Sequence, residues 1–218
     1  MKFFSIATVI ALAGMSPVAA ATITTLYNTG VDASGTAVTG NGADSHWTLN
    51  GGAAYTGGTN GTFPIGPWLA ETSTSRWLTP SANAADSFNP SADGIYRYTE
   101  TFSLTGLKAA TATLSGRFAS DNTIDAVLLN GTAITGSGGS FQSFTTFNST
   151  GGTFNAGVNT LTFVLRNFAQ NGGNPTGLRV EVTGTAAIVP EPAMWGLLVV
   201  GFGLVGVATR RRSAAVAV

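Results

Sequence analysis

The sequence predicts an all-β protein: a jelly-roll or β-sandwich domain between an N-terminal signal peptide and a single C-terminal transmembrane helix. Glycine is abundant, with 29 of 218 residues. Short runs of alternating apolar and polar residues are separated by glycine-rich turns, a pattern typical of sandwiches and jelly rolls. The length allows one ordinary domain plus targeting segments. We therefore place the signal peptide at residues 1–21, the sandwich at 22–186 and the C-terminal segment that contains the helix at 187–218.

The first residues are typical of a secretory signal peptide. Lys2 precedes an apolar run from Phe3 to about Ala13, and small residues follow. The apolar run is too short to span a membrane, which argues against an N-terminal anchor. We expect export through the Sec translocon and cleavage by signal peptidase after Ala20 or Ala21.

Alternation predicts the strands of the exported domain. The candidate strands, in chain order, are 23–27, 95–104, 111–118, 124–129, 157–165 and 178–183. In the second of these, Tyr96, Tyr98 and Phe102 share one face. Glu100 falls on the same face and needs a partner. The looser stretch 31–62, which is glycine-rich from Gly51 to Gly61, is expected to form a long ordered excursion.

One turn, one unusual phenylalanine spacing and the end of the domain complete the prediction. Asn130-Gly131 is the strongest short hairpin signal in the chain. Three phenylalanines, Phe141, Phe144 and Phe147, are three residues apart, a spacing that suits neither a regular strand nor a polar helix. Residues 185–189 are expected to form a brief linker to the C-terminal segment.

The C-terminal segment has the composition of a membrane helix. Residues 193–209 carry no charge, and about 17 residues at about 1.5 Å each give a helix of roughly 25 Å. Trp195 can lie at one interface, and the arginines at 210–212 can reach the other. Because basic clusters stay on the cytoplasmic side, the chain before Pro190 is expected to face outward.

The same segment carries a short motif in front of the helix. Pro190-Glu191-Pro192 is followed by Trp195 and, after the helix, by Arg210, Arg211 and Arg212. Together these residues resemble the PEP-CTERM sorting signal, in its PEPxxW variety. The resemblance implies a precursor tethered to the inner membrane of a Gram-negative bacterium. It also implies cleavage near the motif by an exosortase and transfer to the cell surface or extracellular matrix.

The physical properties of the motif agree with this resemblance. Two prolines block helix formation at the outer boundary and leave an extended segment that a protease can reach. The alternative is a plain single-pass anchor that is not cleaved.

A second resemblance concerns the exported domain. The segments 121–131, 157–163 and 174–178, with His46-Trp47 and residues 75–78 upstream, resemble galactose-binding-like jelly rolls. These modules are appended to many glycoside hydrolases. The resemblance implies a fold and a lectin-like role, and it carries no binding residue with it.

Charge and cysteine content exclude several classes of function. Residues 22–189 contain six basic and nine acidic side chains, so this region has a net charge of −3. That balance argues against nucleic acid as a partner. The chain has no cysteine, which excludes disulfides, thiol catalysis and cysteine metal sites.

Sugar binding would use an exposed aromatic ring flanked by amide or carboxylate groups. The candidate ligand-binding residues are Trp47, Trp68, Asn122, Asn171 and Asn174. The alternative is that the tryptophans fill the core of the sandwich.

A structural calcium ion is the one cofactor that the sequence suggests. Asp121, Asn122 and Asp125 offer oxygen ligands, and the alternative is hydrogen bonding within a tight turn. The single histidine, His46, is expected to be structural, and no motif provides paired catalytic carboxylates.

The sequence therefore predicts a secreted, non-enzymatic protein of the cell surface or extracellular matrix that associates with exopolysaccharide. The alternative is a structural or adhesive biofilm matrix protein with no carbohydrate ligand of its own.

Overall fold

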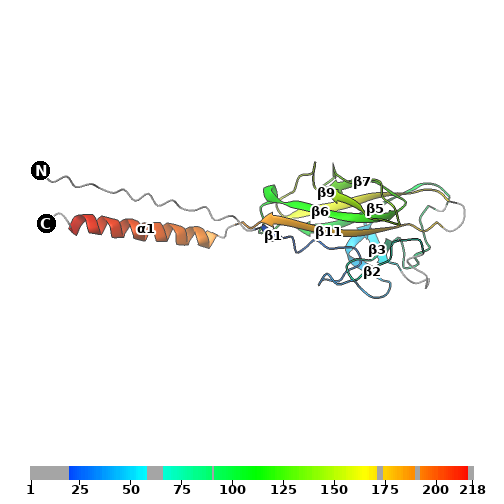
Figure 1. Cartoon of the computed structure of the whole chain (residues 1–218), viewed down its shortest axis with the longest axis horizontal. Coiled ribbons are helices and arrows are strands. Elements are labelled where there is room, and N and C mark those ends of the chain that lie inside the picture. Colours follow the sequence, from blue (N-terminus) through cyan, green and yellow to red (C-terminus); the bar gives the residue numbers. More distant parts are fainter. Residues whose placement is uncertain (1–19, 58–65, 90, 171–173, 190–191, 216–218) are drawn as a thin grey trace.

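The computed structural model describes residues 20–57, 66–89, 91–170, 174–189 and 192–215. Over these residues the chain is mostly strand, and eleven strands belong to one sheet (Figure 1). The strands are β1 (Ala20–Thr22), β2 (Ala43–Leu49), β3 (Gly52–Thr56), β4 (Leu78–Thr79), β5 (Gly94–Ser103), β6 (Thr113–Asp121), β7 (Thr123–Leu129), β8 (Thr132–Ile134), β9 (Thr145–Asn148), β10 (Val158–Asn167) and β11 (Gly177–Ala187). A 3-10 helix, η1 (Ala109–Thr111), precedes β6, and α1 (Pro192–Ala215) follows β11.

The sheet closes almost completely on itself. Its strand order is β8-β7-β10-β5-β2-β3-β4-β11-β6-β9, and β1 pairs with β11. The two ends of this order meet where Thr135, just after β8, bridges to Asn148 of β9. There the Asn148 N–H donates to the Thr135 carbonyl at 3.1 Å. The predicted all-β sandwich is confirmed.

Aromatic rings from several strands fill the interior enclosed by the sheet. The Phe163 ring of β10 lies 5.1 Å from the Phe147 ring of β9 and 5.5 Å from the Phe118 ring of β6. In β5, Tyr96 and Tyr98 are buried on this face together with Phe102, as the alternation predicted. Each large ring removes much apolar surface from water, so these contacts supply most of the stabilisation of a domain without disulfides.

The prediction of a first strand at 23–27 is wrong. The strand in this region is β1, which ends at Thr22. Beyond it, the Ile23 N–H donates to the Gly184 carbonyl at 2.9 Å, whereas the Tyr27 N–H donates to the Glu100 carboxylate. The segment thus bonds to β11 and then to a side chain of β5, and no single strand pairs with it. The same contact supplies the partner that Glu100 needs.

The prediction that residues 185–189 form a linker is also wrong. Thr185 and Ala186 belong to β11, which continues to Ala187 and pairs there with β1. Alternation ends at Thr183, but pairing with β1 keeps the backbone extended.

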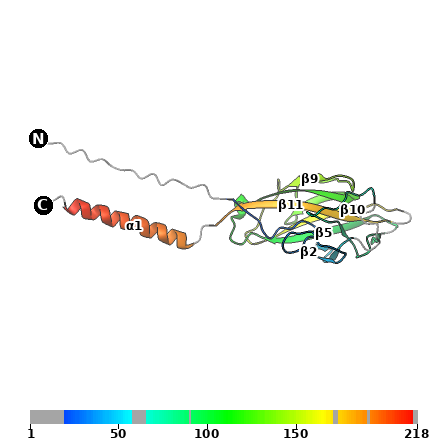
Figure 2. The same ribbon diagram turned by 60° about the horizontal axis from the view of Figure 1, so that its bottom comes forward.

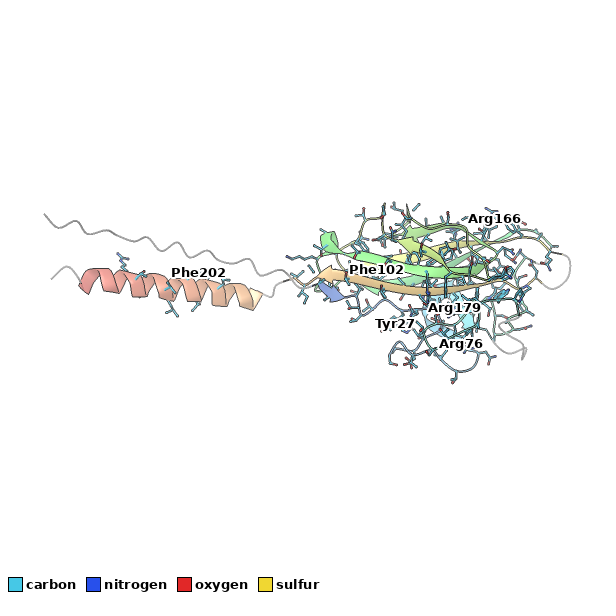
Figure 3. The ribbon with its side chains drawn as sticks, viewed as in Figure 1. Tyr27, Arg76, Phe102, Arg166, Arg179 and Phe202 are labelled. Carbon is cyan, nitrogen blue, oxygen red and sulfur yellow. The ribbon has the colours of Figure 1, made fainter. Side chains whose placement is uncertain are left out.

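Residues 31–57 of the predicted excursion are ordered, and residues 58–62 lie outside the described residues. Arg76 holds it in place, because its guanidinium donates to the Val38 carbonyl at 2.9 Å and to the Gly57 carbonyl at 3.0 Å (Figure 3). Arg76 also pairs with Glu71 at 2.8 Å. The backbone approaches so closely that a Cβ on Gly30 would lie 2.5 Å from the Arg76 Cβ.

The predicted C-terminal helix is present as α1, which projects away from the sandwich in both orientations (Figures 1 and 2). Its described apolar side chains are exposed, including Phe202, labelled in Figure 3. Among the described residues, however, no helix has both the length and the apolar character needed to cross a membrane.

Candidate functional site

The two tryptophans predicted to stack on sugar are buried. Trp47 is 1% exposed, and its Nε1–H donates to the Tyr27 carbonyl at 3.2 Å. Trp68 is 6% exposed, and its ring lies 4.5 Å from the Trp77 ring. The expectation of an exposed tryptophan platform is corrected: packing these large rings stabilises the interior and leaves neither available to a ligand.

The two predicted asparagines within the described residues contact the backbone just after β10. Asn122 accepts a hydrogen bond from the Phe168 N–H at 2.7 Å, and Asn174 donates to the Phe168 carbonyl at 3.1 Å. Both amides thus bind the backbone after β10, which indicates a structural role. Asn171 lies outside the described residues.

The three residues proposed for calcium already have partners. Asn122 donates to the Asp121 carboxylate at 2.7 Å, while Asp125 forms an ion pair with Arg166 at 2.6 Å. Within the described ranges, no group of three or more histidine or acidic residues is placed to hold a metal. Burial raises the pKa of Asp121 to about 6, although a hydrogen bond from the Trp68 side chain opposes this shift.

A polar groove lies on the outer face of β9, β6 and β11, three neighbouring strands labelled in Figure 1. Two hollows of about 340 Å³ and about 540 Å³ share Ser115, Asn148 and Thr183, so they form one continuous depression along the strands. Alternation along each strand turns these polar side chains outward and the apolar ones into the core.

The strand register arranges the groove residues in rows. In the middle row, Ser115 of β6 lies between Asn148 of β9 and Thr183 of β11. In the next row, Arg117 lies opposite Glu181, and these two side chains form an ion pair at 2.6 Å. The groove therefore offers hydroxyl and amide groups beside the Arg117–Glu181 ion pair, whose carboxylate also contacts the buried Arg179 at 3.4 Å.

Asn28, in the segment after β1, forms one wall of the groove and is held there by hydrogen bonds. The Asn28 Oδ1 accepts a hydrogen bond from the Val182 N–H at 2.7 Å, and its Nδ2 donates to the Thr74 carbonyl at 3.0 Å. This wall is anchored to β11 on one side and to the loop before β4 on the other. We name the groove, with this wall, the polar face.

Sequence reasoning did not identify the polar face. The candidate strand at 111–118 contains Ser115 and Arg117, but its sequence gave no sign of which strands would lie beside it. Asn148 and Thr183 belong to strands that are distant in the sequence, and only their pairing with β6 brings them beside Ser115.

The C-terminal end of the sandwich positions the sorting segment. Ile188 bridges to Leu107, and the Val189 N–H donates to the Gly106 carbonyl at 2.9 Å. The backbone is therefore bonded to the sandwich up to the residue before Pro190. Pro190 and Glu191 lie outside the described residues, as do the side chains of Pro192, Trp195, Arg211 and Arg212, while Arg210 is exposed.

Residues 189–212 match the PEP-CTERM protein-sorting motif. The prediction of this motif is confirmed, and the motif implies an exported protein with an exosortase as its processing partner. The PEP-CTERM match covers only the segment behind the sandwich and does not distinguish the PEPxxW variety. A comparison with curated proteins found no match.

The comparisons give no support to the galactose-binding-like resemblance. The PEP-CTERM motif therefore stands as the assigned feature of the chain, and the role of the sandwich rests on its own geometry.

Proposed function

We propose that this protein is a non-enzymatic component of the cell surface or extracellular matrix, sorted by an exosortase and associated with exopolysaccharide. The PEP-CTERM motif directly behind the last strand carries the sorting half of this proposal. In the precursor, the motif tethers the sandwich at the inner membrane. Cleavage near Pro190 then releases the domain or transfers it to the surface.

The polar face supports association with a polysaccharide. Hydroxyl and amide side chains hydrogen-bond the hydroxyls of sugars. The buried tryptophans, by contrast, favour the alternative of a structural matrix protein without a carbohydrate ligand. Assembly through a free sheet edge has little support, because the backbone around Thr135 and Asn148 joins the two ends of the sheet.

The polar face is better suited to binding a glycan than to hydrolysing one. Glycosidases use two carboxyl groups on either side of the scissile bond. Among the described residues that line the groove, Glu181 is the one carboxylate, and it pairs with Arg117.

The sorting half is tested by mass spectrometry of the protein at the surface of exosortase-producing cells. We expect the mature chain to end near Pro190 and to lack the arginines at 210–212. The double substitution Pro190→Ala, Pro192→Ala is expected to leave the precursor intact, whereas Ser213→Ala, outside the motif, is the matched control. Recovery of wild-type chain with Arg210 still attached at the surface would remove the sorting claim.

The polysaccharide half is tested by co-sedimentation of the full chain with exopolysaccharide from the producing cells. Retention above that of a non-binding reference protein supports the proposal. Background retention, together with self-assembly of the protein alone, would favour the structural alternative.

A further inference from the structure

We propose that the polar face is a binding site for a single chain of neutral polysaccharide, with Ser115, Asn148 and Thr183 as its central hydrogen-bonding groups. This assignment rests on the proposed association with exopolysaccharide and adds its location and the charge class of the ligand.

The middle row of the polar face has unused hydrogen-bonding capacity. Within the described structure, the hydroxyls of Ser115 and Thr183 and the amide nitrogen of Asn148 make no side-chain hydrogen bond, while the Asn148 oxygen accepts one from the Thr150 N–H at 2.9 Å. Neighbouring strands are about 4.8 Å apart, a spacing comparable with the width of one sugar ring. A chain in the groove can therefore meet donors and acceptors from three strands.

Charge selects a neutral ligand. Arg117 and Glu181 are the charged residues among the described groove lining and form an ion pair, while Arg179, the second arginine that contacts Glu181, is buried. An acidic polysaccharide would need unpaired cations, which this surface does not present.

The composition of the polar face also distinguishes a glycan from a protein partner. The centres of protein interfaces are enriched in exposed aromatic and other large apolar side chains. Here the apolar residues of the lining, such as Phe147, turn into the core and are buried, while the outward positions carry threonine, serine and asparagine together with the Arg117–Glu181 ion pair. The groove is fixed by the sheet ladder and by the Asn28 wall, so it is formed before any ligand binds.

The test uses the full chain in mild detergent and the exopolysaccharide of the producing cells, separated into neutral and acidic fractions by anion exchange. Wild type is expected to bind the neutral fraction. The double variant Ser115→Ala, Asn148→Ala is expected to bind roughly tenfold more weakly, because it loses two neutral hydrogen-bonding groups. Ser115→Trp, which fills the groove, is expected to abolish binding, and Ser115→Thr, which keeps the hydroxyl, to preserve it.

Matched controls lie on β5, which three strands separate from β11 in the strand order. Thr101 is an exposed residue of β5, and Thr101→Ala and Thr101→Trp are expected to bind like wild type. Equal melting temperatures across the set show that the variants are folded. If wild type binds and Ser115→Trp binds equally well, or if wild type binds only the acidic fraction, the assignment of the polar face is overturned while the polysaccharide association stands. If wild type binds neither fraction, the association itself fails.

Discussion

At the scale of single residues, two acidic side chains lie in the interior of the sandwich. Glu100 and Asp121 are both buried, and burial raises the pKa of each carboxyl group. Each is held by one or two hydrogen bonds, from the Tyr27 N–H to Glu100 and from Asn122 and Trp68 to Asp121. These two residues make the stability of the sandwich depend on pH.

For Asp121 the direction of this dependence follows from its pKa, which rises from 3.8 to about 6 on folding. Between these values the folded state keeps a proton that the unfolded state loses. The stabilisation is therefore complete below about pH 4 and is lost as the pH rises through about 6, a change of roughly 2–3 kcal/mol.

We expect Asp121→Asn, which stays neutral, to remove this loss, so that the variant is more stable than wild type at pH 7. Urea unfolding of the released domain between pH 4 and pH 7 measures the difference. Asp125→Asn is the control, since Asp125 is largely exposed and pairs with Arg166. Glu100 is present in all three proteins, so its contribution cancels. An Asp121→Asn variant with the wild-type pH slope would contradict the prediction.

At the scale of elements, the β7–β8 hairpin shows how local turn chemistry fixes strand register. Asn130 and Gly131 have φ values of 51° and 82°, which the tight turn requires at both positions. The Asn130 side chain also accepts a hydrogen bond from the Thr160 N–H at 2.9 Å. The turn thereby ties β7 to β10 as well as to β8.

Gly131→Ala is expected to lower the free energy of unfolding by about 1 kcal/mol, because alanine resists a positive φ. No atom lies within 4 Å of the position that its Cβ would occupy, so the cost comes from the backbone and not from a clash. Gly42→Ala provides the control, since Gly42 has equal space and no positive φ. Equal destabilisation by both substitutions in urea unfolding would show that the turn conformation is not the cause.

The end of β11 is the element that presents the PEP-CTERM motif. Because Val189 is hydrogen-bonded to the 105–108 loop, a protease that needs extended substrate on both sides of its cleavage site must first detach Ile188 and Val189. Inserting Gly-Ser-Gly-Ser between Val189 and Pro190 supplies extended residues before the motif, so the Val189 hydrogen bond no longer has to break. Processing is therefore expected to become several-fold faster, because breaking that bond costs about 1 kcal/mol.

Pulse-chase labelling of the precursor measures this rate. The same insertion after Gly35, an exposed turn with no atom near its Cβ position, serves as the control and is expected to leave the rate unchanged. An unchanged or slower rate for the Val189 insertion would show that the strand end does not limit access.

At the scale of the whole molecule, the sandwich and the tail are separate structural units. The described side chains of α1 are exposed, and the helix extends away from the sheet (Figure 2). The core is built from residues of the sandwich alone, from Ile23 to Ala186.

A chain that ends at Val189 is therefore expected to fold with the melting temperature of the full-length protein, within about 2 °C, because it loses no core contact. Exported without a tail, it is expected in the soluble fraction instead of at the membrane. Differential scanning calorimetry and cell fractionation check the two outcomes. A large fall in melting temperature would show that the tail contributes to the core.

The sequence by itself determined the features that depend on neighbouring residues. Alternation located β5, β10 and most of β11, because side chains of a strand point to opposite faces in turn, and a nearly continuous apolar run located β7. The Asn130-Gly131 turn and the PEP-CTERM segment were predictable for the same reason: each is a contiguous pattern with its own chemistry.

Only the tertiary structure decided the features that depend on pairing between distant segments. Trp47 and Trp68 were compatible both with a sugar platform and with the core, and only packing showed that they are buried. Phe141 and Phe144 lie against the Trp68–Trp77 cluster, whereas Phe147 enters the main core, which explains a spacing that fits no regular element. The polar face exists because β6 pairs with both β9 and β11, and no local pattern records which strands become neighbours.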